Sequence, residues 1–150
     1  MERPIVAGYR HTGIIVKDMD ASVKFYRDIL GLKVVQEFSD NTDYINVITG
    51  TKNCDAHFFK LDCGDGTILE LLEYRNYPTE LIPHKIYGAG ACHVALRVYD
   101  AEEAYERLVK AGVTVLSRPV LSSEKIAKVF FCMDPNKIRV EMVEMVNMPK

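Results

Sequence analysis

The sequence predicts an α+β fold in which one structural module is written twice. A histidine, an aspartate and a glycine recur in the same order, at separations of 82, 82 and 81 residues: His11, Asp18 and Gly31, then His93, Asp100 and Gly112. Each histidine stands near the start of a strand-like segment. Each aspartate precedes a helical pattern, and each glycine follows it. Internal repetition of this kind fixes the architecture of a chain.

The first half reads as a strand, a helix and four further strands. Residues 9–17 alternate and are rich in β-branched side chains, which indicates a strand. A helix is expected over residues 20–30, with Asp18 or Asp20 as its N-cap and Gly31 as its end. Further strands are expected over residues 33–38, 44–49, 56–61 and 67–74, and residues 62–66 form a tight turn.

The second half repeats this plan after a connection at residues 75–90, where prolines and glycines break both periodicities. It holds a strand at His93, a helix capped by Asp100, and strands over residues 128–133 and 138–145. The buried stripe of the helix is expected to comprise Ala104, Leu108 and Ala111. Modules 9–74 and 91–146 are expected to form a single domain, 1–150, with a mixed sheet curled around one shared cleft.

The composition excludes several classes of function. The chain has 150 residues, 48% hydrophobic and 27% charged, as in an ordinary globular domain. Its net charge of −2 argues against nucleic-acid binding, and no apolar run approaches the ~20 residues of a membrane span. The start of the chain lacks the apolar core of a signal peptide. Four dispersed cysteines without a CxxC indicate free thiols in the cytoplasm, and Cys92 and Cys132 are expected to be buried and inert.

A metal site is predicted by acids that recur inside apolar strands. Glu70 and Glu141 lie 71 residues apart, each in the last strand of a module. A carboxylate in such a strand is costly unless it is paired or bound to a cation. Together with His11 and His93 they supply one imidazole and one carboxylate per module, donors that suit zinc, nickel, cobalt, manganese or iron. The sequence therefore predicts one divalent metal ion with room for substrate oxygens.

The remaining histidines and acids have ordinary interpretations. A single histidine or glutamate in a strand is usually a structural or solvent-facing side chain, and only the joint recurrence favours ligands. Glu73 and Glu144 fall on the opposite strand face from the predicted ligands and are expected to be solvated. His57 is interpreted as a strand side chain, and His84 as a connection residue that overhangs the cleft.

These motifs resemble the vicinal oxygen chelate superfamily, which includes glyoxalase I, methylmalonyl-CoA epimerase, extradiol dioxygenases, and fosfomycin and bleomycin resistance proteins. The resemblance covers nearly the whole chain and is closest to members of the glyoxalase I and epimerase type. It rests on HTGIIV from residue 11, DASVKFYRDILGL from residue 20, DGTILELLE from residue 65, HVALRV from residue 93 and DPNKIRVE from residue 134. It implies paired βαβββ modules and a divalent metal that chelates vicinal substrate oxygens. The implied ligands are His11, Glu70, His93 and Glu141.

Several positions depart from the patterns of individual families. Glyoxalase I carries a glutathione-binding arginine four residues after its first ligand, where this chain has Ile15. The epimerase has glutamine where this chain has Glu70, and the dioxygenases and fosfomycin enzymes use two histidines and one carboxylate. Bleomycin-binding members lack the ligands. The usual glycine of the last turn is Lys137, and Asn136 is expected to take the left-handed conformation there.

The resemblance implies a metal-dependent isomerase or lyase that removes an α-proton from a small substrate and stabilises the resulting enediolate. Glu141 is its expected catalytic base, and Glu70 the alternative. Two other interpretations stay open: an iron-dependent ring-cleaving oxygenase, and a non-catalytic protein that binds an antibiotic or another small aromatic molecule. Aromatic residues that could line such a binding pocket are Tyr9, Phe58, Phe59, Tyr74 and Tyr77. A homodimer is expected. Family members place their sites within one chain or across a dimer interface, and the sequence leaves these two alternatives open.

Overall fold

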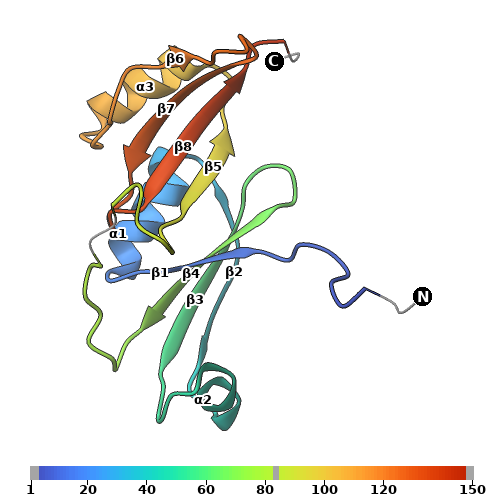
Figure 1. Cartoon of the computed structure of the whole chain (residues 1–150). Helices are drawn as coiled ribbons and strands as arrows, with labels where there is room; N and C mark the ends of the chain where they lie inside the picture. Colours follow the sequence, from blue (N-terminus) through green and yellow to red (C-terminus); the bar gives the residue numbers. More distant parts are fainter. Residues whose placement is uncertain (1–3, 83–84, 148–150) are drawn as a thin grey trace. The chain divides into compact units, whose positions relative to one another are not determined.

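The structure of the chain, a computed structural model, describes residues 4–82 and 85–147. The chain forms two compact units, Met1–Thr79 and Glu80–Lys150 (Figure 1). Each unit holds one four-stranded mixed sheet, built from a strand, a helical segment and three more strands. The α+β class and the two βαβββ modules are confirmed. The single domain and the shared cleft stay predictions.

The first unit follows the predicted order except at residues 44–49. Its elements are β1 (Thr12–Ile15), α1 (Met19–Val23), η1 (Lys24–Ile29), β2 (Lys33–Asp40), α2 (Asp43–Thr49), β3 (Ala56–Asp62) and β4 (Ile68–Tyr74). The strand order is β1-β4-β3-β2, with β1 parallel to β4 and the other pairs antiparallel. Of the two possible N-caps, Asp18 is the one used, because its carboxylate accepts from the Ala21 N–H at 2.9 Å. Gly31, at φ +86°, ends the helical segment.

The segment predicted as a strand over residues 44–49 is instead the helix α2, so that prediction is wrong. Its β-branched residues suggested a strand, but β2 and β3 already pair from Lys33↔Asp62 to Asp40↔Ala56. The chain must therefore return to the point where β2 ends, and a short helix spans this connection compactly. Ile45 anchors α2 on the sheet, and Gly50, at φ +68°, ends the helix.

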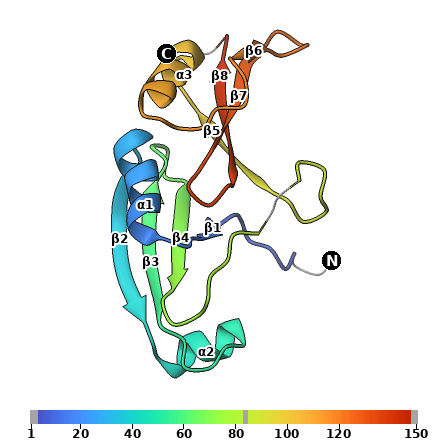
Figure 2. The ribbon, with the colours of Figure 1, turned by 90° about the vertical axis from the view of Figure 1, so that its left-hand side faces the viewer.

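The two faces of the first sheet differ in their surroundings: one is packed against α1 (Figure 2), and the other carries the predicted ligand Glu70. One face carries buried Ile14, Leu61, Leu69 and Leu71, and α1 lies along it (Figure 2). The alternation of side chains sends the other residues of the same strands to the second face. A β-bulge between Val34 and Gln36 adds one residue to β2 and so brings Gln36 opposite Lys60 on that second face. The second face therefore carries a row of paired residues, Gly13, Glu70, Lys60 and Gln36.

The second unit repeats the arrangement. Its elements are β5 (His93–Arg97), α3 (Ala101–Lys110), β6 (Val120–Leu121), β7 (Ala127–Met133) and β8 (Arg139–Met145), in the strand order β5-β8-β7-β6. Asp100 caps α3 through the Glu103 N–H at 3.1 Å, as predicted. Leu108 is buried, but Ala104 is only half-buried and Ala111 is exposed. The predicted stripe is too long because Ala111 is the C-cap, where the helix ends.

The last turn corrects a second prediction. Lys137, at φ +64°, takes the left-handed conformation itself. Asn136 is buried and is fixed by Asp134, which accepts hydrogen bonds from its backbone N–H at 2.8 Å and from its side-chain amide at 3.1 Å. A lysine thus occupies a backbone conformation that favours glycine.

The acids predicted to be solvated have a structural role. Glu73 accepts a hydrogen bond from the Met19 N–H at 3.1 Å, and Glu144 accepts one from the Ala101 N–H at 3.0 Å. Each therefore binds the first backbone N–H of the helix in its own unit, where a negative charge is stabilising. A cationic or titratable side chain lies 4.0 Å from each acid, His57 beside Glu73 and Lys128 beside Glu144. His57 lies in β3, as predicted.

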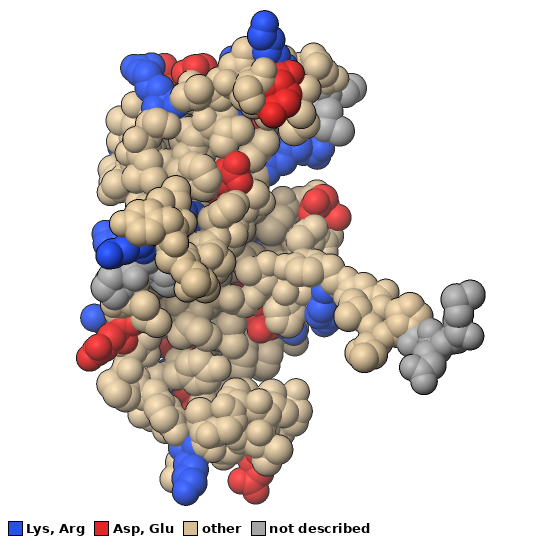
Figure 3. Space-filling model, viewed as in Figure 1, with Lys and Arg blue, Asp and Glu red and all other residues tan. Residues whose placement is uncertain are grey.

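Two further predictions concern the cysteines and the membrane. Cys132 is fully buried, and burial, reinforced by the charge of Asp134, raises its pKa to about 12. Cys92 is exposed because it precedes β5, so its predicted burial is wrong. Among the described residues no helix is long and apolar enough to cross a membrane. On the face drawn in Figure 3, the described basic and acidic side chains are scattered, without an extended patch of one sign.

Candidate metal centre

The first predicted pair of ligands meets within the first unit. His11 directly precedes β1, and Glu70 lies in β4 beside it. The His11 Nε2 atom is 3.4 Å from Glu70 Oε1. The Glu70 side chain is only 9% exposed, whereas that of His11 is 32% exposed. A largely buried carboxylate thus faces an accessible imidazole.

The second predicted pair meets in the same way within the second unit. His93 opens β5, and its Nε2 atom is 3.1 Å from Glu141 Oε2 in β8. The His93 side chain is 52% exposed and that of Glu141 is 22% exposed. The His93 ring also packs edge-on against Phe131, with the ring centroids 5.6 Å apart. This pair is therefore more accessible than the first.

The repeat positions the two pairs by the same register. Gly13 of β1 pairs with Glu70, and Ala95 of β5 pairs with Glu141. Each small residue stands two positions after the histidine and so lies on the same strand face as it. A small side chain there leaves room for the histidine and the glutamate to meet. A side chain in place of Gly13 would approach the Leu72 methyl group at 3.3 Å.

The geometry of each pair fits adjacent ligands of one metal ion. A zinc–nitrogen or zinc–oxygen distance of about 2.1 Å places neighbouring ligands roughly 3–3.4 Å apart. The observed separations are 3.4 Å for His11 and Glu70 and 3.1 Å for His93 and Glu141. The His11 Nδ1 atom is buried without a hydrogen-bond partner, so the acceptor that normally orients a metal-bound histidine is not found among the described residues.

The donors occur as two pairs in the part of the chain that the structure describes. Over residues 4–82 and 85–147, no three histidine, cysteine, aspartate or glutamate side chains gather closely enough to hold a metal ion. The structure thus brings His11 to Glu70 and His93 to Glu141. His84, predicted to overhang the cleft, lies outside the described residues.

The family model of the glyoxalase/bleomycin resistance protein/dioxygenase superfamily matches residues 8–142. The chain belongs to this superfamily. The resemblance inferred from the sequence is thereby confirmed.

Relatives within the superfamily agree with the assignment. A lactoylglutathione lyase of Haemophilus influenzae is 27% identical over 136 residues, covering 89% of this chain and 90% of the relative. A lactoylglutathione lyase of Schizosaccharomyces pombe is 30% identical over 146 residues, but the chain spans only 46% of its length. A glyoxalase family protein from Bacillus cereus has the same fold, with a TM-score of 0.85 at 19% identity over 98% of this chain and 99% of that one.

Lys60 lies beside the pair of His11 and Glu70, and the sequence did not predict it as part of the site. Lys60 of β3 pairs with Glu70, and its Nζ atom lies 3.7 Å from Glu70 Oε2. The predicted turn at residues 62–66 contained the necessary signal, because a hairpin centred on Asp65 places Lys60 opposite Glu70. At the equivalent position of the second unit, Phe131 pairs with Glu141.

Of the aromatic residues proposed for a pocket, Tyr74 and Tyr77 line one pocket together, with Lys17, Glu73, Arg75 and Thr79, and the others lie elsewhere. Phe58 is buried and Tyr74 is half-buried, and both pack in a cluster with Ile45 of α2. Burial is the main cause that raises the pKa of Tyr74, and the charges of Cys54 and Glu70 add to it. Phe59 pairs with Leu71 on the helix-covered face. The other two are surface residues: the Tyr9 hydroxyl contacts Thr12, and Tyr77 bonds the backbone of Lys52.

Proposed function

We propose that His11, Glu70, His93 and Glu141 together bind one divalent metal ion, and that the protein is a metal-dependent lyase or isomerase. The observation that supports this most strongly is the repeated His–Glu contact, at 3.4 Å in one unit and 3.1 Å in the other. Imidazole and carboxylate are donors for zinc, nickel, cobalt, manganese and iron, so the donor set leaves the identity of the metal open. When bound, such an ion supplies Lewis-acid stabilisation of substrate oxygens.

The two glutamates have different surroundings, which supports different roles for them. Glu70 is 9% exposed and has Lys60 Nζ at 3.7 Å, so its carboxylate is enclosed and held in position by a neighbouring cation. Glu141 is more accessible and has Phe131 opposite it in β7. We therefore assign to Glu141, besides its place in the ligand set, the role of the base that takes the α-proton of the substrate, and to Glu70 the role of a ligand. A placed carboxylate of this kind contributes about 10²–10⁴ to the rate.

The proposed substrate is a small molecule with adjacent oxygens and an acidic α-proton. Relatives named lactoylglutathione lyase support this class. Glyoxalase I has its glutathione-binding arginine where this chain has Ile15, so the proposal does not specify whether the substrate contains glutathione. The predicted homodimer also belongs to this proposal.

The test is exchange of the α-proton with solvent deuterium, followed by proton NMR in D₂O. Two probes separate the possibilities: S-lactoylglutathione, and 2-oxobutyrate, which has adjacent oxygens but no glutathione. The proposal expects exchange with at least one probe, loss of that exchange on chelation of the metal, and a decrease of about 10²–10⁴ in Glu141→Gln. Exchange that is insensitive to both changes, or no exchange with either probe, would contradict it.

A further inference from the structure

Lys60 is a cation placed in the same row as a predicted metal ligand. Its ammonium group donates to Gln36 Oε1 at 3.2 Å and lies 3.7 Å from Glu70 Oε2. It also stands over the Phe38 ring, 5.1 Å from the centroid. The side chain is only 19% exposed. Because an ammonium group carries three N–H donors, Lys60 can still donate to a ligand beside Glu70.

The second unit shows that the fold does not require a lysine here. Phe131 is opposite Glu141, just as Lys60 is opposite Glu70, and both pairs are separated by the same offset of 71 residues. A neutral aromatic residue therefore serves at this register position of the module. At this register position, the positive charge occurs in the first unit and not in the second.

The surroundings hold the cation in place. The bulge in β2 brings Gln36 opposite Lys60 and Phe38 opposite Phe58. The two phenylalanine rings stack at 4.6 Å, with an angle of 6° between their planes. Phe38 and Leu72 pack against the buried cluster of Phe58 and its neighbours. The ammonium group is thus fixed between an apolar wall and a carboxylate.

This arrangement leaves excess positive charge once Glu70 also binds a metal ion. The carboxylate then faces a divalent cation and Lys60 at once, and the two cations repel each other. A ligand that carries its own negative charge next to the coordinated oxygens relieves this repulsion and gains charge-assisted hydrogen bonds. A neutral ligand does neither.

We propose that Lys60 is a specificity-determining residue that binds a carboxylate of the substrate, next to the oxygens that approach the metal. This inference rests on the proposed function and narrows its substrate class to small acids with a carboxylate beside a carbonyl or hydroxyl group. No bond is made or broken by Lys60, which binds and orients the anion.

The test compares ligands of one shape and different charge on the cobalt-loaded protein. Oxamate carries one carboxylate beside a carbonyl, and oxamide is its neutral counterpart. Their binding is followed by calorimetry and by the visible absorption of Co²⁺. We expect Lys60→Met to lower the affinity for oxamate about tenfold or more, because a charged hydrogen bond is lost, and to leave the affinity for oxamide unchanged. Lys60→Arg should retain most of the oxamate affinity.

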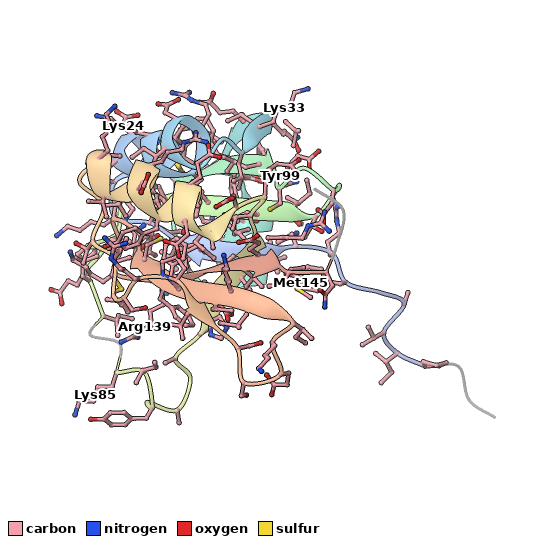
Figure 4. All side chains as sticks on the ribbon, turned by 90° about the horizontal axis from the view of Figure 1, so that it is seen from above. Lys24, Lys33, Lys85, Tyr99, Arg139 and Met145 are labelled. Carbon is pink, nitrogen blue, oxygen red and sulfur yellow. The ribbon has the colours of Figure 1, made fainter. Side chains whose placement is uncertain are left out.

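Two controls separate this result from unfolding and from a general loss of charge. Lys33→Met removes an exposed lysine of the same sheet, which projects into solvent in Figure 4. This substitution should leave the affinities of both oxamate and oxamide unchanged. Lys60→Phe introduces the residue type found opposite Glu141 and should behave as Lys60→Met does. An oxamate affinity that falls less than twofold, or that falls together with that of oxamide, would overturn the inference. If the wild-type protein binds no Co²⁺, the proposed function fails first, and this inference fails with it.

Discussion

Glu73 and Glu144, which accept the first backbone N–H of the helix in their own units, give a prediction that follows directly from the repeat. Replacing Glu144 by alanine should destabilise the second unit, because its Oε2 atom accepts the Ala101 N–H at 3.0 Å. Ala101 is fully buried, so water is a poor substitute for the lost acceptor. The Glu144 side chain is itself only 12% exposed, which strengthens the interaction.

The magnitude can be worked from these contacts. A hydrogen bond to a charged group contributes about 1.5–3 kcal/mol, so Glu144→Ala should lower the free energy of unfolding by about 2–3 kcal/mol. Glu144→Gln keeps an acceptor oxygen but removes the charge at the start of the helix, which is worth about 0.3–1 kcal/mol. The two variants should therefore differ by at least about 1 kcal/mol.

The assay is urea unfolding followed by circular dichroism, with the slope of the transition checked against that of the wild type. Glu103→Ala is the matched control. The Glu103 side chain is 68% exposed and pairs with Arg107 on the surface, so this substitution should cost less than about 0.5 kcal/mol. A Glu144→Ala variant as stable as this control would refute the assignment of Glu144 as the acceptor for the first N–H of α3.

Three further predictions concern the last turn, a buried thiol and the first helix cap. Lys137→Gly should raise stability by about 0.5–1 kcal/mol in the same assay, because it relieves the φ of +64°; a loss of stability would contradict this. The pKa of Cys132 rises from 9.0 to about 12, so the unfolded chain binds fewer protons above pH 9 and stability falls between pH 9 and 12. The slope from this thiol is at most about 1.4 kcal/mol per pH unit, and the total slope should decrease in Cys132→Ala, where Tyr74, whose pKa is also raised, still contributes; a slope unchanged by this substitution, in unfolding curves at pH 8 and 10, would count against it. Glu73→Ala should destabilise the first unit by about 2 kcal/mol, and an unaffected urea transition would show that Met19 needs no acceptor.

The sequence was most informative where a pattern occurs twice. The two helices, their caps Asp18 and Asp100, and the His–Glu contacts in each unit follow from residues that recur at nearly constant spacing. Periodicity inside one segment was less reliable. Residues 44–49 have strand-like composition, but the pairing of β2 with β3 leaves them only a short connection, which forms a helix.

Other errors came from contacts that local patterns do not encode. Glu73 and Glu144 are correctly placed on the strand face away from the predicted ligands, but that face is covered by the helix whose N–H they bind. Lys60 was not predicted because its contacts depend on long-range pairing. The register of β3 with β4 brings it to Glu70, and a bulge in β2 brings it to Gln36. Such cross-strand relations need the hairpin to be built before they can be read.

The central claim is that two His–Glu pairs bind one divalent metal ion, and metal content tests it most directly. Untagged protein and its Glu141→Gln variant should be reconstituted with zinc, nickel, cobalt, manganese and iron in turn, and analysed for metal per chain. We predict close to one ion per wild-type chain and a clearly reduced content in the variant, because an amide is a weaker ligand than a carboxylate. A wild-type protein that retains none of these metals would contradict the assignment of His11, Glu70, His93 and Glu141 as ligands.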